Sequence, residues 1–498
     1  MASFVGIDLG TTFSAVAHID DTGRPAIVHN DIGANITPSV VWRSGPDAIV
    51  VGEEARKQWS VDSTDVAARF KRDMGTSRTW VLGDQSFSPT DLSTFVLRKL
   101  RADTIAATGD IVEAVVTTPA NFSHEAREAT MAAATAAGLP VKFIINEPTA
   151  AALYYAFKSG TELGGVYAVY DLGGGTFDVS VIRVDGQDID VLASNGVSRL
   201  GGDDFDEIIQ KIVAAKYKSI TGMTLDLNDY TKNQAEEDKK SLSRRETVKV
   251  RVGQHNIEIS REDFTAAISS LIAQTEMLCE ATVEEAGVAL SDIRSVFLVG
   301  GSTRIPSVQR SVERVFKMKP ESTANVDEVV ALGAALYAAY KGDRSHLSPV
   351  QQSAIGRIAV TESTSKCFGT LSLTHDAARG AVMENAVLIR KGAKIPCSVT
   401  KSFYTIREGQ EVVTCDVTES TSPEKDPRFV KVIWRGDLAL PAGRPTNQEV
   451  VVTFAYDVNQ MMRCSFIDKA SGRETAIDLS MGNSGRLDTS AVDRFLVE

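Results

Sequence analysis

The sequence predicts an α/β domain built from two similar halves, followed by an all-β domain. A strand–glycine turn–strand pattern occurs at residues 166–182 and again at residues 5–16. Each copy is followed by a strand that ends in hydroxyl residues and then by a helix. A repeated pattern of this kind indicates that one structural plan is used twice. Short alternating segments recur after residue 357 without a long helical pattern, and they indicate the all-β part.

The glycine turn of the second half lies at residues 171–178, which read DLGGGTFD. Consecutive glycines let another group approach the main chain closely, and the exposed N–H groups of such a turn form an anion-binding concavity. Asp171 and Asp178 frame the turn. Carboxylates beside a bound phosphate are expected where a hard cation such as Mg²⁺ lies between them. An ordinary hairpin is the alternative reading of a single glycine run.

The first half repeats this plan at residues 5–16, which read VGIDLGTTFSAV. Each copy is followed by a second repeated pattern, a strand that ends in hydroxyl residues and then a helix. Residues 114–119 lead into a helix predicted over 123–137, and residues 295–306 lead into one predicted over 308–316. We therefore expect each half to present a phosphate-binding hairpin to one shared cleft. A dinucleotide fingerprint is excluded because its glycines open a helix, and a P-loop is excluded because the sequence contains no Gly-Lys pair.

Five motifs follow one another in the part of the chain before residue 344. They are GIDLGTT at 6–12, NEPTAAA at 146–152, DLGGGTFD at 171–178, LGGDDFD at 200–206 and VGGSTRIP at 299–306. Together they resemble the nucleotide-binding domain of the seventy-kilodalton heat-shock chaperone family, the DnaK type. The resemblance implies a duplicated actin-like ATPase domain with two RNase H-like halves over residues 1–343, followed by a β-sandwich domain.

The resemblance also implies a site for ATP or ADP with Mg²⁺. Asp8 and Asp171 are expected to hold the metal, largely through water. The residues expected to bind the nucleotide come from both glycine turns, from the 200–206 motif, from a helix predicted over 230–243 and from the 299–306 motif. They are Gly10, Thr11, Thr12, Phe13, Gly173, Gly174, Gly175, Gly201, Gly202, Glu236, Lys239, Lys240, Ser243, Gly300, Gly301, Ser302, Arg304 and Asp327.

Four of these residues share one face of the predicted helix, because Glu236, Lys239, Lys240 and Ser243 recur at i, i+3, i+4 and i+7. A salt-bridged surface stripe is the simpler explanation of that pattern. The family uses the same spacing to clasp adenine and ribose, with the stem of a basic side chain stacked on the base. Lys240 stands where the family commonly has arginine, which predicts weaker stacking. Asp327 matches the closing edge of the same pocket.

The catalytic residues implied by the resemblance are Lys71, Glu147, Asp171, Thr176 and Asp178. Three cations between residues 69 and 72 are usually a solvated face, but the family places a lysine here to orient the attacking water. Helix capping alone would explain the charge of Glu147. The family instead uses this glutamate to hold the water shell of the metal. Asp178 is expected to assist, and Thr176 is expected beside the γ-phosphate as a candidate for self-phosphorylation.

Pro119 and Arg127 match positions that, in the chaperones, relay the nucleotide state to the second domain. A strand terminator and a surface arginine are the alternative readings of these two residues. The residues alone do not decide between the two readings.

Composition restricts the possible partners. The formal net charge of −12 argues against nucleic acid, because phosphate backbones are bound by clustered Lys and Arg. The first residues lack the basic start of a signal peptide, and no apolar stretch is long enough to span a bilayer, so neither targeting nor membrane insertion is expected. Five widely spaced cysteines without a Cys-x-x-Cys pair are typical of buried, reduced thiols in a cytoplasmic protein.

The remainder of the chain predicts a polar linker, a sandwich and a tail. Residues 344–357 are polar and lack the leucine or valine run that the chaperones dock on the nucleotide domain, so coupling between the domains is in doubt. Residues 358–480 resemble the substrate-binding sandwich more loosely, and residues 375–384, expected to arch over a peptide, match poorly. Residues 481–498 have room for one short helix, so a lidless, divergent member of the family is expected.

Two functions remain open. The first is an ATP-hydrolysing, chaperone-like protein that binds unfolded or extended polypeptide, with a J-domain co-chaperone and a nucleotide exchange factor as possible partners. The second is a nucleotide-controlled scaffold that docks one specific protein, with slow or absent turnover. A small-molecule phosphotransferase shares the fold, but nothing in the sequence indicates a sugar or acyl pocket.

Overall fold

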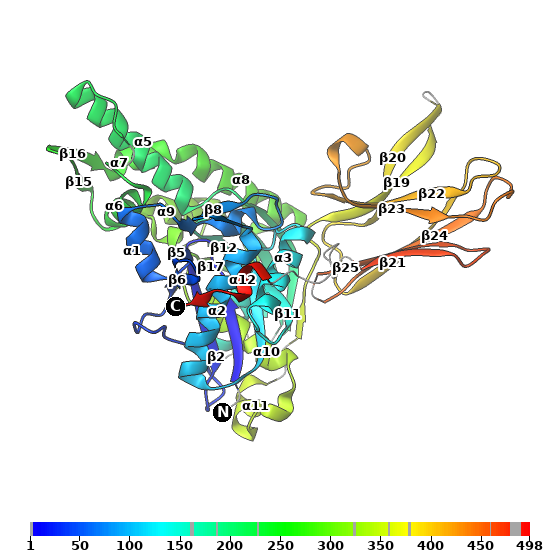
Figure 1. The fold of residues 1–498 in the computed structure, drawn as a ribbon, viewed down its shortest axis with the longest axis horizontal. Helices are drawn as coiled ribbons and strands as arrows, with labels where there is room; N and C mark the ends of the chain where they lie inside the picture. Colours follow the sequence, from blue (N-terminus) through cyan, green and yellow to red (C-terminus); the bar gives the residue numbers. More distant parts are fainter. Residues whose placement is uncertain are drawn as a thin grey trace. The chain divides into compact units, whose positions relative to one another are not determined.

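The structure is a computed structural model, and it describes residues 3–159, 164–185, 188–226, 229–321, 325–356, 359–376, 380–458, 460–478 and 490–498. The chain divides into two compact units. Unit 1 comprises residues 1–360 together with 488–498, and unit 2 comprises residues 361–487 (Figure 1). Unit 2 is therefore an insertion in the chain of unit 1.

The first sheet of unit 1 carries the first glycine turn. Its hairpin of β1 and β2 is antiparallel, whereas β10 runs parallel to β1 and β11 runs parallel to β10. The turn between β1 and β2 therefore lies at the same edge as the carboxyl end of β10. The strand order is β11 (Val141–Asn146), β10 (Ile111–Thr118), β1 (Ser3–Asp8), β2 (Phe13–Ile19) and β3 (Pro25–Ile27), with β4 (Thr37–Pro38) paired to β2.

The second sheet repeats this order around the second glycine turn. The hairpin of β12 and β13 is antiparallel, and β17 runs parallel to β12 on its other side, as β10 does beside β1. This repetition agrees with the duplicated α/β plan expected from the sequence. The strand order is β17 (Ile293–Val299), β12 (Gly164–Leu172), β13 (Phe177–Asp185), β14 (Asp188–Val197) and β18 (Ala359–Thr361).

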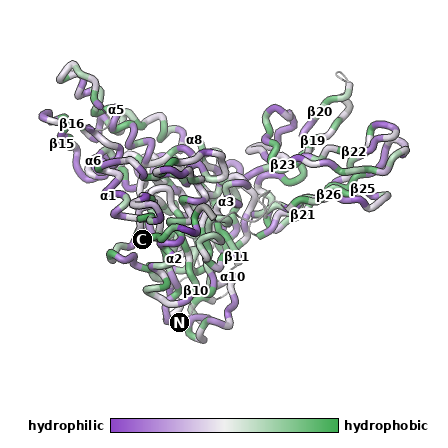
Figure 2. The backbone as a smooth tube through the Cα atoms, viewed as in Figure 1, coloured by the Kyte–Doolittle hydropathy of each residue, from purple (hydrophilic) through white to green (hydrophobic). Residues whose placement is uncertain are grey.

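Two apolar helices, α4 (Glu147–Ser159) and α10 (Val329–Lys341), share one core cluster with both sheets. The cluster joins Ala151 of α4 and Ala335 of α10 to Val115 of the first sheet and Val169 of the second. Hydrophobic colours dominate α10 in Figure 2. A helix that is apolar on all sides is expected to be buried on all sides, and α10 fixes the two halves together.

The outer helices cover the remaining faces of the two sheets. Ser88 begins α2 with a capping box to Asp91 and with Pro89 in the first turn, which explains where this helix starts. In the first half these helices are α1 (Glu53–Val61), α2 (Pro89–Thr108) and α3 (His124–Ala136). In the second half they are α5 (Gly202–Thr221), α6 (Lys232–Arg244), α7 (Arg261–Ala267), α8 (Ser269–Glu285) and α9 (Pro306–Phe316). The hairpin of β15 (Thr247–Val252) and β16 (His255–Ser260) follows α6, and the short elements are β8 (Trp80–Leu82), β9 (Gln85–Phe87), η2 (Leu290–Asp292) and η3 (Gly301–Arg304).

A small sheet of the first half contains strands from both ends of the chain. Its order is β27 (Leu496–Val497), β6 (Ala48–Val51), β5 (Val40–Gly45) and β7 (Val66–Ala68). The strand β7 leads through Arg69 into the 3₁₀ turn η1 (Phe70–Asp73). The last described segment, with α12 (Ser490–Asp493) and β27, lies beside β6 and α2 in Figure 1.

The segment predicted to be a polar linker is folded on unit 1 over its described residues. It forms η4 (Arg344–His346) and α11 (Pro349–Ile355). Ser348 caps α11 through Gln351, whose side-chain amide also donates to the carbonyl of Asp20 at 2.9 Å, and Ile355 is buried. Composition indicated a linker, but the capping residues and one apolar anchor are sufficient to dock it.

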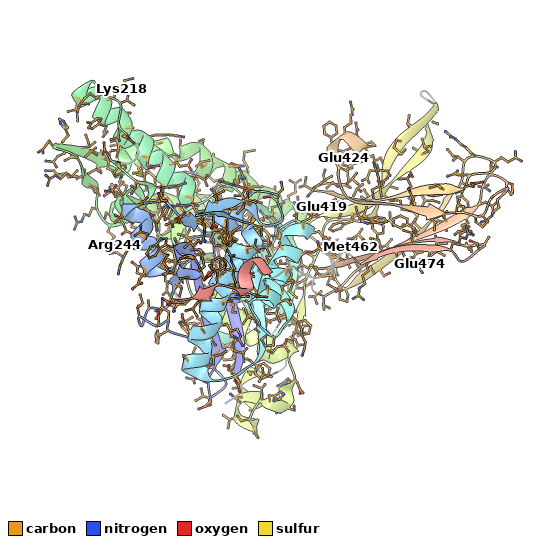
Figure 3. All side chains as sticks on the ribbon, viewed as in Figure 1. Lys218, Arg244, Glu419, Glu424, Met462 and Glu474 are labelled. Atoms are coloured by element: carbon orange, nitrogen blue, oxygen red, sulfur yellow. The ribbon has the colours of Figure 1, made fainter. Side chains whose placement is uncertain are left out.

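The described residues of unit 2 form two four-stranded antiparallel sheets that share one core, which is a β-sandwich. Phe368, Val417 and Leu438 of the first sheet pack in one cluster with Phe454 and Met462 of the second. Figure 3 labels Met462 and Glu474, which lie on two neighbouring strands of the second sheet. The sheets are β20 (Gly380–Ile389), β19 (Cys367–Asp376), β22 (Val412–Ser420) and β23 (Lys431–Ala439), and β21 (Cys397–Tyr404), β24 (Glu449–Tyr456), β25 (Met462–Asp468) and β26 (Glu474–Asp478), with η5 (Pro427–Phe429) before β23.

Two expectations from the sequence concern the cysteines, which were predicted to be buried, and membrane insertion, which was not expected. Cys279, Cys367, Cys415 and Cys464 are buried, whereas Cys397 is partly exposed. Over the described part of the chain, no helix combines the length and the apolar character that crossing a membrane requires.

Candidate functional site

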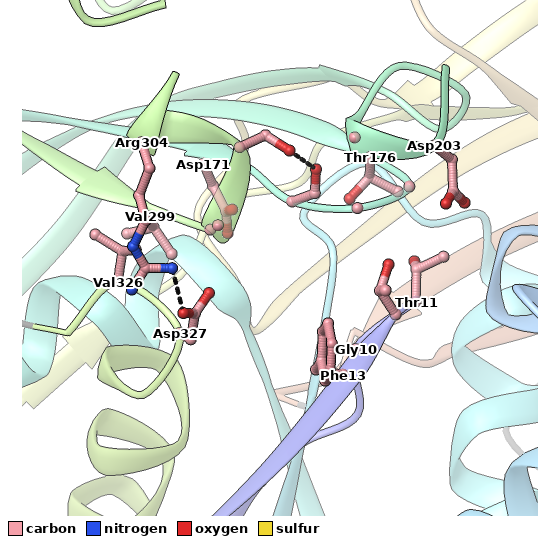
Figure 4. Close-up of a pocket in the computed structure, with 18 of the residues that line it drawn as sticks. Gly10, Thr11, Phe13, Asp171, Thr176, Asp203, Val299, Arg304, Val326 and Asp327 are labelled. Carbon is pink, nitrogen blue, oxygen red and sulfur yellow. Dashed lines mark hydrogen bonds and ion pairs between the residues drawn. The ribbon is translucent and has the colours of Figure 1, made fainter. Parts of the chain in front are cut away.

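A cavity of about 530 Å³ lies between the two halves of unit 1 (Figure 4). This volume is in the range of small-molecule and cofactor sites. Both glycine turns, α6, η3 and the start of α10 line it. The sequence-predicted residues at its wall are Asp8, Gly10, Thr11, Thr12, Phe13, Lys71, Glu147, Asp171, Gly173, Gly174, Gly175, Thr176, Gly202, Glu236, Lys239, Lys240, Ser243, Gly300, Gly301, Ser302, Arg304 and Asp327.

The two glycine turns contact each other at one side of the cavity. A Cβ atom at Gly174 would lie 1.8 Å from Oγ1 of Thr12, and one at Gly175 would lie 2.6 Å from Oγ1 of Thr11. Any larger residue at Gly174 would push the two halves apart. Oγ1 of Thr12 is buried and has no hydrogen-bond partner among the residues that the structure describes. Since buried hydroxyls are normally paired, this atom indicates a ligand between the turns.

A third glycine, Gly300, connects β17 to η3 beside the second glycine turn. Its φ of 81° favours glycine, its N–H donates to the carbonyl of Val326 at 3.0 Å, and a Cβ atom there would lie 2.5 Å from the carbonyl oxygen of Leu172. Oγ of Ser302 then donates to the carbonyl of Gly173 at 2.8 Å. Arg304 and Asp327 form an ion pair at this end of the cavity (Figure 4).

A cluster of buried acidic side chains lies at the floor of the cavity and, with Asp178, directly behind it. Burial raises the pKa of Asp8 to about 7 and that of Asp178 to about 8, and the carboxylate of Glu147 adds to both effects. Burial, followed by the Glu147 and Asp178 carboxylates, raises the pKa of Asp171 well above its usual range. Oδ2 of Asp178 has no hydrogen-bond partner in the described part of the chain. Desolvated carboxylates of this kind are stabilised by a cation.

Lys71 supplies one positive charge to this cluster. Its Nζ lies 2.6 Å from Oε1 of Glu147, and the lysine is only 5% exposed. Burial alone lowers the pKa of Lys71, but the carboxylates of Glu147 and Asp8 outweigh that effect and raise it, so the lysine stays charged. The solvated-face alternative for residues 69–72 is therefore wrong for Lys71.

The flanking cations are also paired. Arg69 has a left-handed backbone with a φ of 62°, pairs with Asp203 and places its guanidinium 4.5 Å from the centre of the Trp59 ring. Nε of Arg72 donates to the carbonyl of Gly175 at 2.9 Å. Both arginines connect η1 to the second half, and they fix Lys71 between the two halves.

Mg²⁺ fits this group of residues if water and phosphate oxygens complete its shell. Oxygen ligands and retained water are what Mg²⁺ prefers, and Asp8 and Asp171 supply desolvated carboxylates at the cavity wall. Within the described ranges, no group of three or more His, Cys, Asp or Glu side chains is arranged to hold a metal directly. The donor set is thus suited to a hydrated ion beside a nucleotide rather than to an ion held by protein alone.

The predicted face of α6 lines the opposite end of the cavity. Nζ of Lys239 lies 2.7 Å from Oδ1 of Asp206 and donates to the carbonyl of Gly202 at 2.8 Å. Glu236 is buried and pairs with Lys240 at 2.9 Å. An exposed salt-bridged stripe does not describe these residues, because Glu236 and Lys239 are buried.

The ring of Phe13 closes that end of the cavity. Nζ of Lys240 lies 5.4 Å and the guanidinium carbon of Arg56 lies 5.0 Å from the ring centre. Arg56 also pairs with Glu236 at 3.3 Å, so α1 of the first half contacts α6 of the second. The residues expected to hold a base and a ribose are thus brought together.

Two predicted residues do not line the cavity. Asp178 lies behind Asp171 in the β12–β13 hairpin, and its Oδ1 accepts from the N–H of Asn121 at 3.3 Å. Gly201 packs against the second glycine turn, where a Cβ atom would lie 2.7 Å from Gly174. Both support the wall from behind.

Among the residues that the structure describes, eight that line the cavity were not predicted from the sequence. Arg244 (labelled in Figure 3) follows Lys240 by four residues, so the helical spacing contained the signal. Asp203 and Asp206 lay in a recognised motif without an assigned role. The others depend on tertiary packing; the full set is Ile36, Asp203, Asp206, Arg244, Val299, Ile305, Val326 and Val330.

Arg127 is buried, so the surface-arginine alternative is wrong. It donates to Oγ1 of Thr118 at 2.8 Å and to the carbonyl of Ala120 at 2.9 Å. It therefore holds the turn around Pro119 at the carboxyl end of β10, close to the acidic floor of the cavity.

Comparison with known proteins gives one match that spans nearly the whole chain. The sequence model of a family described as Hsp70 protein matches residues 4–498.

Proposed function

This chain belongs to the Hsp70 family, and from that premise we propose that it binds and hydrolyses ATP in the unit 1 cavity and binds unfolded or extended polypeptide through its sandwich. One observation carries the nucleotide part of the proposal. A buried Lys71–Glu147 pair and desolvated carboxylates lie beside two glycine turns that meet around an unpaired threonine hydroxyl.

The residues of the cavity divide into binding and positioning groups. The backbone of the two glycine turns and the hydroxyls of Thr11 and Thr12 would bind phosphate oxygens, and the α6 face with Phe13 would bind the base and ribose. Asp8 and Asp171 would hold hydrated Mg²⁺. When bound, that ion neutralises charge on the phosphates.

Hydrolysis would depend on positioning rather than on a covalent step, because phosphoryl transfer relies mainly on orientation and charge stabilisation. Lys71, held by Glu147, would orient the attacking water. Asp178 lies behind them with its pKa raised by burial to about 8, near the pH at which a side chain exchanges protons efficiently. Thr176, at the cavity wall, remains a candidate for self-phosphorylation.

The polypeptide part of the proposal rests on apolar side chains at the surface of unit 2. Leu373 and Met383 are cross-strand partners on β19 and β20, and they are 44% and 49% exposed. The strand β20 is an edge of its sheet. An edge strand with exposed apolar side chains is suited to an extended peptide. J-domain proteins and nucleotide exchange factors are the partners that family membership makes plausible.

Titration calorimetry with ATP tests the site. Wild-type protein is expected to bind ATP tightly only with Mg²⁺, and Asp171→Asn is expected to lose that Mg²⁺ dependence. Lys142→Ala, an exposed lysine on β11, serves as the matched control and is expected to bind as wild type. Undiminished Mg²⁺-dependent affinity in Asp171→Asn contradicts the site. Tight binding without any turnover, with or without an unfolded peptide, favours the scaffold function instead.

A further inference from the structure

The segment that follows the sandwich, residues 490–498, returns to unit 1 and is called the strap here. Its strand β27 extends the small sheet by pairing in parallel with β6. The N–H of Leu496 donates to the carbonyl of Asp47 at 3.0 Å, and that of Glu498 donates to the carbonyl of Ile49 at 2.9 Å. The backbone of the strap is therefore docked as a strand.

Two side chains of the strap are inserted into the core of the first half. Val492 and Phe495 are buried, whereas Leu496 on the same segment is 65% exposed. The Phe495 ring centre lies 5.7 Å from those of both Phe87 and Phe95 in edge-to-face geometry. Three aromatic rings packed in this way stabilise one another beyond their buried area.

One arginine of α2 holds the start of the strap. Nη1 of Arg98 donates to the carbonyl of Val492 at 2.7 Å, and the same guanidinium pairs with Asp493. The strap is thus attached by main-chain pairing, by aromatic packing and by an ion pair, so its position is defined by three independent kinds of contact.

The core that receives the strap also supports Lys71. Phe70, the residue before Lys71, belongs to the same cluster as Val492 and Phe495. The sheet connects them as well, because β27 pairs with β6, β6 with β5, and β5 with β7, which leads through Arg69 into η1. No strand lies between β7 and Lys71, so a shift of this sheet moves the lysine.

We propose that the docked strap positions Lys71 for ATP turnover, with Phe495 as the principal positioning residue. This inference rests on the proposed function of the cavity. Phe495 packs on Phe87 and Phe95, and these rings belong to the same core cluster as Phe70. Loss of the Phe495 ring therefore weakens the core that supports η1 from the side of the first half. The strap follows unit 2 in the chain, so unit 1 contains described segments both before and after the sandwich.

The test compares Phe495→Ala with Leu496→Ala, its exposed neighbour, in the full-length protein. Phe495→Ala is expected to lower kcat at least about tenfold, since misplacement of a positioned group by about 1 Å can cost up to about 100-fold in rate. Its Kd for Mg·ATP is expected to stay within about twofold of wild type. Leu496→Ala is expected to match wild type in both. Hydrogen exchange is expected to accelerate at residues 69–73 in Phe495→Ala alone.

Rescue in trans separates positioning from general damage. A synthetic peptide with the sequence of residues 488–498 is expected to restore kcat of Phe495→Ala, and the same peptide with alanine at position 495 is expected to fail. Should Phe495→Ala not fold, Phe495→Leu provides the same readouts with a smaller loss.

Three results overturn the proposal. The first is wild-type kcat in a variant whose Leu496 and Glu498 amides exchange freely. The second is an equal loss of ATP affinity and kcat, because the strap would then stabilise the whole unit rather than Lys71. The third is unchanged exchange at residues 69–73. That measurement needs no turnover, so an inactive wild-type protein would refute the proposed function while the exchange data still decide the role of the strap.

Discussion

At the scale of single residues, the cavity concentrates buried charge that is only partly compensated. Lys71 pairs with Glu147, and its charge acts to lower the pKa values of Asp8 and Asp171, but burial and the Glu147 carboxylate outweigh it and leave both values raised. Buried carboxylates without full compensation destabilise a folded protein. Their presence beside two glycine turns is therefore better explained by ligand binding than by stability.

Asp206 tests whether burial raises the pKa of carboxylates in this cavity, because it lies beside Lys239 and not with Asp8 and Asp171. Burial raises its pKa to about 6, although Lys239 acts in the opposite direction. The folded protein therefore binds more protons than the unfolded chain between about pH 4 and pH 6. The stability contributed by protonated Asp206 is present at low pH and is lost as the pH rises through 6.

The pH dependence of this stability is measured from the unfolding midpoints of wild type and Asp206→Asn, without nucleotide, from pH 5 to pH 7.5. The stability of wild type relative to the variant is expected to fall with rising pH, by up to about 1.4 kcal/mol per pH unit near the lower end, and to level off above pH 7. A difference that does not vary with pH contradicts the raised pKa of Asp206.

At the scale of elements, sequence patterns identified the parts whose local chemistry is self-contained. The glycine turns at 171–178 and 5–16 were recognisable because each needs its special backbone and its apolar flanking strands within a dozen residues. The α6 face was recognisable because helical spacing places its four residues together.

Elements that depend on distant partners were not predictable. The strap contains too few residues to show a strand pattern, and β27 exists only because β6 offers it an edge. The helix α11 was concealed by its polar composition, although Ser348 and Gln351 carried a capping signal. The surface-arginine alternative for Arg127 failed because its guanidinium is buried by the turn at 118–120. The side chain donates to Thr118 and to the carbonyl of Ala120 in that turn.

The β19–β20 hairpin is predicted to contact a bound peptide through its exposed apolar side chains. Leu373→Ser together with Met383→Ser is expected to weaken binding of an unfolded, fluorescently labelled peptide at least about tenfold, because two exposed apolar contacts are lost. Val432→Ser on the opposite edge strand β23 is the matched control, since Val432 is 40% exposed on the same sheet.

Anisotropy titrations of the three proteins measure this effect. Equal weakening by Val432→Ser would show that the peptide does not select the hairpin. Unchanged affinity in the double variant would place the peptide site elsewhere or favour the scaffold function.

At the scale of the whole molecule, the chain order joins the two units at both ends of the sandwich. Unit 2 leaves unit 1 after β18 and the chain returns as the strap. Over its described residues the predicted linker is docked on unit 1, because Ile355 of α11 is buried and Gln351 donates to the carbonyl of Asp20. The described residues that precede and follow unit 2 in the chain are thus both docked on unit 1.

We propose that Lys71 in this cavity is required for ATP turnover but not for ATP binding. Single-turnover release of phosphate from Mg·ATP, measured side by side with ATP affinity, tests it most directly on wild type, Lys71→Ala and the control Lys142→Ala. We expect Lys71→Ala to keep its ATP affinity within about threefold and to lose at least about 100-fold in rate, while the control behaves as wild type. Phosphate release by Lys71→Ala at the wild-type rate would show that Lys71 does not position the attacking water.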